Sequence, residues 1–267
     1  MAPAGGADKV RETTVAAPPQ GESASGMEAR SVLDRYLASR AAERQLLFGA
    51  QAEEPATKRV AKRLFPAPLR MRPRLVATRA LRVREGRRLA ALPRPLRLHL
   101  GSGNEHKDGW VNIDLAGYPV EAAWNLARPL PLPGGSAEAV FHEHLLEHLT
   151  LEQGLAFCVE SHRLLRPGGI LRVGVPDAGA AAHSYADDAG AFLERVRPGR
   201  PTAMLGLQEL FYYPGHRTMY DFETLVLLLR AAGFGEPERR AFGETALEPP
   251  PDSAHRRDET LYVEARR

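Results

Sequence analysis

The stretch Leu98-His99-Leu100-Gly101-Ser102-Gly103, followed closely by Val111-Asn112-Ile113-Asp114, decides the fold of this chain. An apolar strand ends in a glycine turn, and a second apolar strand ends in a carboxylate. Glycine lets the backbone approach a ligand closely, and an acidic residue at a strand tip accepts hydrogen bonds from ribose hydroxyls. The pattern therefore predicts a site for a nucleoside-bearing ligand across the strand ends.

Length and composition set the outer limits. The chain has 267 residues, of which 43% are apolar, enough for one sizeable core in one or two domains. The lone cysteine, Cys158, excludes an internal disulfide framework and a cysteine-rich zinc site, and its helical surroundings predict a buried structural thiol. The N-terminus lacks the apolar core of a signal peptide, and no apolar run reaches about eighteen residues. We expect a soluble, cytoplasmic protein.

Positive charge is concentrated in residues 57–97. The net charge of the chain is only +3, but this stretch has fourteen Lys or Arg residues and a single acidic residue, Glu85. One interpretation is attraction to a polyanion, such as nucleic acid, an anionic lipid surface or a phosphorylated glycan carrier. The other is simple solvation of helices by arginine. Phe65 is the only aromatic residue in the stretch, so base stacking is disfavoured, and a membrane surface or subunit contact ranks ahead of RNA.

The composition divides the chain into three parts. Residues 1–28 are rich in Ala, Gly, Pro, Ser and Glu and are predicted to form a disordered tail. Residues 29–95 are predicted to form a helical, Arg-rich arm that several prolines interrupt. Residues 96–267 are predicted to form one compact domain.

The compact domain alternates strands with helices, which indicates a Rossmann-like α/β fold with a mostly parallel sheet. Two closing strands have no room for a crossover helix between them, so they predict a C-terminal antiparallel hairpin. Residues 101–110 alone join the first two strands, so the first crossover helix must be reduced or absent. The predicted strands are 96–100, 111–115, 122–126, 139–143, 170–175, 238–242 and 261–265, and the predicted helices are 151–165 and 222–232.

Three further segments carry a family resemblance. They are WNLARPLPLP at 124–133, AVFHEHLLEHL at 139–149 and LLRPGGILRV at 164–173. In this order and spacing they resemble the class I S-adenosylmethionine-dependent methyltransferases, in particular the small type 11-like branch often found among envelope and glycan genes. The resemblance covers residues 96–267, and AAGF at 231–234 and ETLYVEA at 259–265 also look like that branch.

The resemblance implies a cofactor site for S-adenosyl-L-methionine. The glycine turn would lie against its methionine part, Asp114 would hold the ribose hydroxyls, and the residues after the fourth strand would border the substrate cleft. Asn125 stands where the family usually has an aspartate near the adenine amino group, and its amide oxygen still accepts a hydrogen bond from an amine. The implied cofactor residues are Gly101, Ser102, Gly103, Asp114, Asn125, His142 and Glu143.

Two residues are candidates for catalysis. His216 lies in a loop that usually overhangs the acceptor site in such enzymes, so it is the first candidate for the base that an oxygen acceptor needs. The alternative is that His216 only fixes the start of the following helix. Asp177 follows the fifth strand and either orients an acceptor hydroxyl or caps the next segment.

Residues 144–148, HLLEH, match the H-x-x-E-H motif of inverted zinc peptidases. That motif belongs on a helix, whereas here it begins where a strand ends. The sequence therefore favours a structural role, in which Glu147 and His148 cap and orient the following helix. Methyl transfer does not itself require a metal, and none is expected.

These features together predict a methyltransferase that acts on oxygen, with a sugar hydroxyl of a glycan or glycosylated metabolite as the acceptor. Methylation of a small aromatic or polyketide metabolite is an alternative. A nucleic-acid methyltransferase or RNA-binding protein that uses the basic arm is another. A degenerate binder without activity is the fourth.

Overall fold

The computed structural model describes residues 28, 30–40, 76, 83–115, 119–187, 190–212 and 215–267. The chain consists of two compact units, Met1–Glu43 and Arg44–Arg267, and each unit is described by itself. In the first unit residues 30–40 form a helix, in which Arg30 Nε donates to Asp34 Oδ1 at 3.0 Å. The predicted tail at 1–27 and most of the predicted arm lie outside the described residues.

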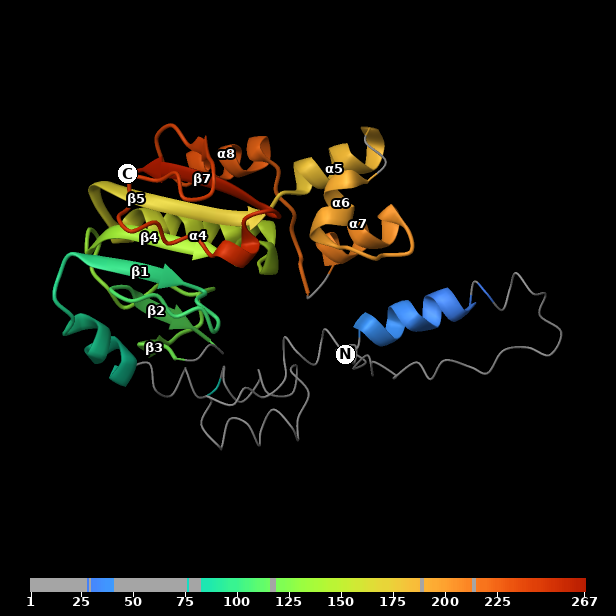
Figure 1. The fold of residues 1–267 in the computed structure, drawn as a ribbon. Helices are drawn as coiled ribbons and strands as arrows, with labels where there is room; N and C mark the ends of the chain where they lie inside the picture. The colour runs from blue at the N-terminus through green and yellow to red at the C-terminus, as the bar shows by residue number, and fades with distance from the viewer. Residues whose placement is uncertain are drawn as a thin grey trace, which may run out of the picture. The chain divides into compact units, whose positions relative to one another are not determined.

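The second unit is built on a seven-stranded sheet in the order β3-β2-β1-β4-β5-β7-β6 (Figure 1). Strands β1 to β5 pair in parallel, while β7 is antiparallel to both β5 and β6. This confirms the mostly parallel sheet with an antiparallel C-terminal hairpin. Residues 101–110 contain turns and no helix, so the predicted loss of the first crossover helix is also confirmed. The strands are β1 (Leu96–Leu100), β2 (Val111–Asp114), β3 (Ala122–Ala123), β4 (Ala137–Glu143), β5 (Leu165–Pro176), β6 (Glu238–Arg240) and β7 (Thr260–Arg266).

Two of the helices, α4 (Leu151–Leu164) and α8 (Phe222–Ala231), begin at caps that the sequence itself encodes. Thr150 and Gln153 form a reciprocal capping box at the start of α4, and the Asp221 side chain accepts a hydrogen bond from Thr224 N at 2.8 Å at the start of α8. Both helices end within one residue of the predicted position. Every helix among the described residues is too short or too polar to cross a membrane. The helices after β1 are η1 (Leu146–His148), α4 (Leu151–Leu164), α5 (Ala178–Asp187), α6 (Ala191–Val196), α7 (Ala203–Tyr212), α8 (Phe222–Ala231) and η2 (Ala254–Arg256).

Helices α5, α6 and α7 form a group that the sequence analysis did not predict. They follow the carboxyl end of β5 and pack on one another beyond the edge of the sheet (Figure 1). Ala181, Leu193 and Leu210 form their small separate core. The group therefore stands next to the strand ends where ligands bind in open α/β sheets.

The sheet is buried on both faces. One face packs against α4 and α8 through a large apolar cluster that includes Val140, Phe157 and Leu229. Cys158 belongs to this cluster, and burial raises the pKa of its thiol to about 12, in agreement with the predicted structural role. The helix of residues 83–90, part of the predicted arm, adds the fully buried Leu89 to the same cluster.

Several strand boundaries differ from the prediction. Strand β3 stops at Ala123, because the Asn125 side chain accepts from Ala127 N at 3.1 Å and forms a turn there. Strand β5 begins at Leu165 instead of 170, since a bulge lets Leu165 pair with Ala137 before the main ladder. Strand β6 ends at 240 instead of 242.

Candidate functional site

Hydrogen bonds hold the glycine turn after β1 against the end of β2. Gly101 N donates to Ile113 O at 2.8 Å, and Gly103 N donates to the Asp114 carboxylate at 3.1 Å. Gly101 and Gly103 have φ values of +75° and +54°, a left-handed backbone that glycine adopts without strain. The turn and the carboxylate therefore form one unit, as the opening motif predicts.

Beside this turn lie open space and a buried hydroxyl that has no hydrogen-bond partner among the described residues. A Cβ on Gly101 would lie 2.8 Å from Leu145 Cδ1, whereas a Cβ on Gly103 would meet no atom within 4 Å. The hydroxyl of Ser102 is buried and has no hydrogen-bond partner among the described residues. The turn thus offers an open approach at Gly103 and a buried hydroxyl with unused hydrogen-bonding capacity.

Asn125 follows β3, next to Trp124, whose backbone N–H donates to Asp114 O at 3.2 Å. The Asn125 side-chain oxygen accepts from Ala127 N, and the second lone pair of that oxygen remains able to accept from an amine. The indole N–H of Trp124 is buried without a partner in the described part of the chain. These residues extend the polar surface from the Asp114 strand tip.

His142 and Glu143 point to opposite faces of β4. The His142 ring is fully buried against Phe157 of α4, with ring centroids 5.1 Å apart, so it lies in the core. Burial lowers the pKa of His142 to about 3. Glu143 accepts from Tyr262 OH at 2.7 Å and from Ser253 N at 3.2 Å, so it fastens the segment before η2 to the sheet.

Asp177 caps α5. Its Oδ1 accepts from Ala180 N at 2.9 Å, and Arg239 Nη2 lies 3.8 Å from Oδ2. This geometry supports the capping alternative for Asp177.

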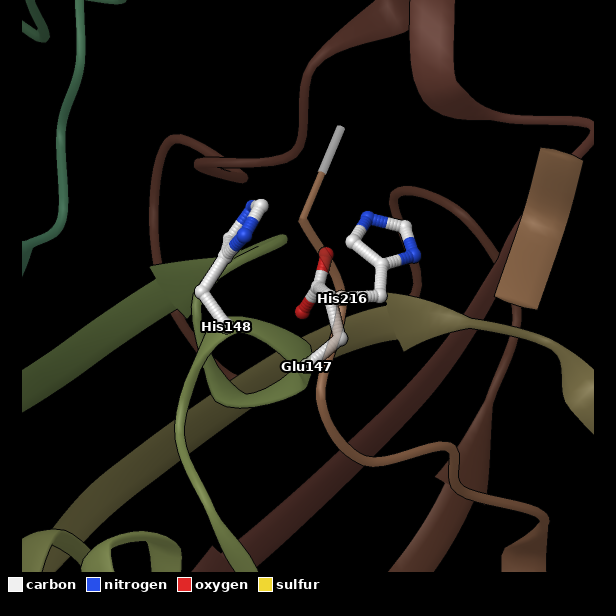
Figure 2. A group of neighbouring side chains, drawn as sticks. All are labelled: Glu147, His148 and His216. Carbon is white, nitrogen blue, oxygen red and sulfur yellow. The ribbon is translucent and has the colours of Figure 1, made fainter. Parts of the chain in front are cut away.

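A second polar group gathers at the end of β4. Glu147 and His148 come from η1, and His216 comes from the loop before α8; their potential ligand atoms all lie within 4.8 Å of one another. Figure 2 shows the Glu147 carboxylate between the two imidazole rings. The loop is held there because Arg217 N donates to Glu147 O at 2.7 Å and Thr218 Oγ1 donates to Leu149 O at 2.8 Å.

Burial dominates the electrostatics of this group. It raises the pKa of Glu147 to about 8 and lowers the pKa of His216 to about 4. The ring Nδ1 of His216 lies 2.7 Å from Leu210 O; since a carbonyl only accepts, Nδ1 carries the hydrogen and Nε2 keeps its lone pair. Burial also lowers the pKa of His148, and a hydrogen bond to the Gly215 backbone opposes this.

The two groups share one edge of the sheet. Strands β1, β2 and β4 run in parallel, so the glycine turn, Asp114 and Glu147 all follow carboxyl ends at the same side. The charge of Asp114 also raises the pKa of His148, against the larger effect of burial. The structure thus joins His216 to Glu147 and His148, a pairing that the sequence analysis missed although the H-x-x-E-H motif marked two of its three members.

The family comparison agrees with this layout. Residues 110–173 match the family model described as a methyltransferase domain. The matched region runs from the start of β2 into β5 and includes Asp114, Glu147 and His148. The chain carries a class I S-adenosylmethionine-dependent methyltransferase domain.

Solved structures show further similarity to this methyltransferase domain. One is an S-adenosylmethionine-dependent methyltransferase from Archaeoglobus fulgidus, with 14% identity over 73% of this chain and 94% of that chain, at a TM-score of 0.42. Another is from Mesorhizobium loti, with 18% identity over 66% of this chain and 94% of that chain, at a TM-score of 0.40. No curated protein matches the chain.

The residues of the methyltransferase domain fit S-adenosylmethionine as the cofactor. The open side of Gly103 admits a ligand close to the backbone, and the buried Ser102 hydroxyl has no protein partner among the described residues. Asp114 stands at the strand tip where an acidic residue accepts from ribose hydroxyls. Asn125 retains an acceptor for an exocyclic amine.

Proposed function

We propose that this methyltransferase domain transfers a methyl group to the oxygen of a sugar hydroxyl, on a glycan or a glycosylated metabolite. The observation that carries the oxygen acceptor is the His216 imidazole, neutral and with Nε2 unprotonated, beside Glu147 at the cofactor edge of the sheet. An oxygen acceptor needs such a proton acceptor, because its hydroxyl proton must leave as the new bond forms. The sugar itself is supported by the family resemblance.

The chain's own residues have three tasks in this proposal. The turn from Gly101 to Gly103 and Asp114 hold and align the cofactor, which supplies an electrophilic methyl group on a positively charged sulfur. Asn125 accepts from the adenine amine. His216 Nε2 accepts the hydroxyl proton. Alignment and proton removal together account for the rate.

Mass spectrometry tests this proposal. The full-length protein is incubated with methyl-labelled S-adenosylmethionine and with separate pools of saccharides, aromatic metabolites and RNA. A labelled methyl ether on a saccharide is the expected product. Label that appears on RNA or on an aromatic metabolite instead would overturn the sugar proposal.

A comparison of two variants tests whether His216 is the general base. We expect His216→Asn to lower kcat by about 10²- to 10⁴-fold, the usual contribution of a positioned base. The matched control is His183→Asn, since His183 is exposed on α5, 87% of its side chain being accessible. Full turnover by His216→Asn would remove His216 from the reaction.

The basic stretch supports a second proposal, that residues 57–97 bind an anionic surface. The observation is its fourteen basic residues against Glu85 alone. Binding to vesicles with anionic lipid is expected to weaken steeply as salt rises, and binding that is insensitive to salt would contradict it. We also propose a cytoplasmic location, supported by a lone cysteine that forms no disulfide.

A further inference from the structure

We propose that Glu147, His148 and His216 bind one divalent transition-metal ion of the zinc class, which holds the oxygen atom of the methyl acceptor. The existence of the site is independent of the proposed function, whereas the role assigned to the ion rests on it. The sequence alone favoured a structural role for Glu147 and His148, because the H-x-x-E-H motif begins where a strand ends, whereas the zinc motif belongs on a helix.

The first support is the ligand set. Two imidazoles and one carboxylate are a known catalytic zinc set, in which three protein ligands leave a position open for water or substrate. All three ligand atoms lie within 4.8 Å of one another, and binding would draw them to about 3.4 Å, the separation that tetrahedral coordination at about 2.1 Å requires. Imidazole favours zinc-class ions over Mg²⁺, which prefers oxygen ligands.

The second support is the hydrogen bonding behind each histidine. Histidines that bind metals usually donate the other ring N–H to a carbonyl or carboxylate, which fixes the ring and leaves one nitrogen for the ion. His216 does this through Nδ1 to Leu210 O at 2.7 Å. A hydrogen bond to the Gly215 backbone raises the pKa of His148, against the larger effect of burial. The His216 ring is thus held with Nε2 free for an ion.

The third support is the unsatisfied carboxylate. The Glu147 side chain is fully inaccessible, and neither of its oxygens has a hydrogen-bond partner within the described residues. His144 Nδ1 lies 3.4 Å from Oε1, but burial lowers the pKa of this imidazole well below its ordinary value, so it supplies no positive charge to the carboxylate. A buried carboxylate without partners is costly, and a cation between Glu147 and the two imidazoles would satisfy it.

The surrounding charges permit a cation. Arg197 Nη1 pairs with Glu259 at 2.6 Å, and Arg256 Nε lies 3.8 Å from Glu143 Oε2. Both of these guanidinium groups therefore have a carboxylate beside them, which reduces their repulsion of an ion. The backbone at His144 has φ +53°, a left-handed conformation that is uncommon outside glycine and concentrates at functional sites.

An ion in this position would change how the acceptor loses its proton. A hydroxyl oxygen in the open position is polarised, so its O–H bond breaks more readily and the proton passes to solvent water. With the ion bound, His216 Nε2 is a ligand and the proton leaves to water; in the metal-free protein His216 Nε2 accepts the proton, as in the proposed function. The acceptor oxygen would also be held at a fixed point at the cofactor edge.

Metal titration of the untagged, metal-free, full-length protein tests the site without cofactor or acceptor. We expect one equivalent of Zn²⁺ to bind by calorimetry, and Co²⁺ to give a saturable visible absorption. Glu147→Gln and His216→Asn should each weaken binding by at least about 10-fold, and His183→Asn should not. The metal site would be overturned if the protein shows no saturable metal binding, or if a folded His216→Asn protein binds the ion with unchanged affinity. If Glu147→Gln does not fold, the His216→Asn variant alone tests the site.

Activity separates this inference from the proposed function. Restored methyl transfer on adding Zn²⁺ to the metal-free protein supports the role of the ion. Full transfer by metal-free protein would overturn that role and leave the oxygen acceptor standing. If the protein binds the metal as predicted but transfers the labelled methyl group to no hydroxyl, the proposed function is refuted and the metal site is still supported.

Discussion

The buried ion pair between Arg172 and Asp252 gives the most direct test of the packing on the second face of the sheet. Both side chains are fully inaccessible. Arg172 Nε donates to Asp252 Oδ1 at 3.1 Å and Nη2 donates to Oδ2 at 2.6 Å, while two backbone carbonyls, of Ala241 and Glu244, accept the remaining bonds at 3.0 Å. The pair thereby anchors the segment after β6 to β5.

Removing one partner of this pair should lower the free energy of unfolding far more than replacing both partners with apolar residues. In Asp252→Ala the Arg172 charge stays buried without its carboxylate, and breaking such a pair typically costs about 3–5 kcal/mol. Asp252 Oδ2 also accepts from Gly243 N at 2.7 Å, so that N–H loses its partner too. We expect a loss of free energy of unfolding within this range, measured by urea denaturation at pH 7.

The matched control is the exposed pair of Arg230 with Glu236, whose N···O distance is 2.5 Å. Arg230→Ala should cost less than about 1 kcal/mol, because exposed ion pairs are well solvated. The double variant Arg172→Met with Asp252→Leu should recover much of the stability lost by Asp252→Ala. A loss below about 1 kcal/mol for Asp252→Ala would refute the reasoning.

Three further predictions follow from the site and the core. Asp114→Ala should weaken S-adenosylmethionine binding by about 1–3 kcal/mol in calorimetry, while the exposed control Asp108→Ala should not, and equal affinities would exclude Asp114. Gly101→Ala should lower both the melting temperature and cofactor affinity, since its Cβ would lie 2.8 Å from a leucine methyl; an unchanged protein would contradict this. Burial lowers the pKa of His142 to about 3, below its ordinary 6.5, so the unfolded chain takes up this proton first as the pH falls. The contribution of His142 to the free energy of unfolding is therefore complete above about pH 6.5, and it declines by about 2 kcal/mol between pH 7 and 5. Urea titrations should show a smaller decline in His142→Leu, and an equal decline would contradict the assignment.

The sheet could be predicted because its signals are local. Leu96 to Leu100 and Val111 to Asp114 are short apolar runs that end in glycine or a carboxylate, and the structure has β1 and β2 there. Helices α4 and α8 carry caps in the sequence itself, at Thr150 and Asp221. Such features depend only on neighbours in the chain.

The rest depends on contacts between distant residues. Helices α5 to α7 are short and cover a small separate core, so neither segment length nor periodicity marks them. His142 follows the apolar strand pattern, yet only the packing of α4 shows that its ring faces the core. His216 reaches Glu147 because backbone hydrogen bonds of Arg217 fix the loop to η1, a contact that no local pattern contains.

Calorimetric titration of the full-length protein with S-adenosylmethionine tests the central claim most directly. The fit of the glycine turn and Asp114 predicts one saturable site and a rise in melting temperature with cofactor. The absence of both binding heat and a thermal shift would contradict the claim that this domain is a working S-adenosylmethionine-dependent methyltransferase.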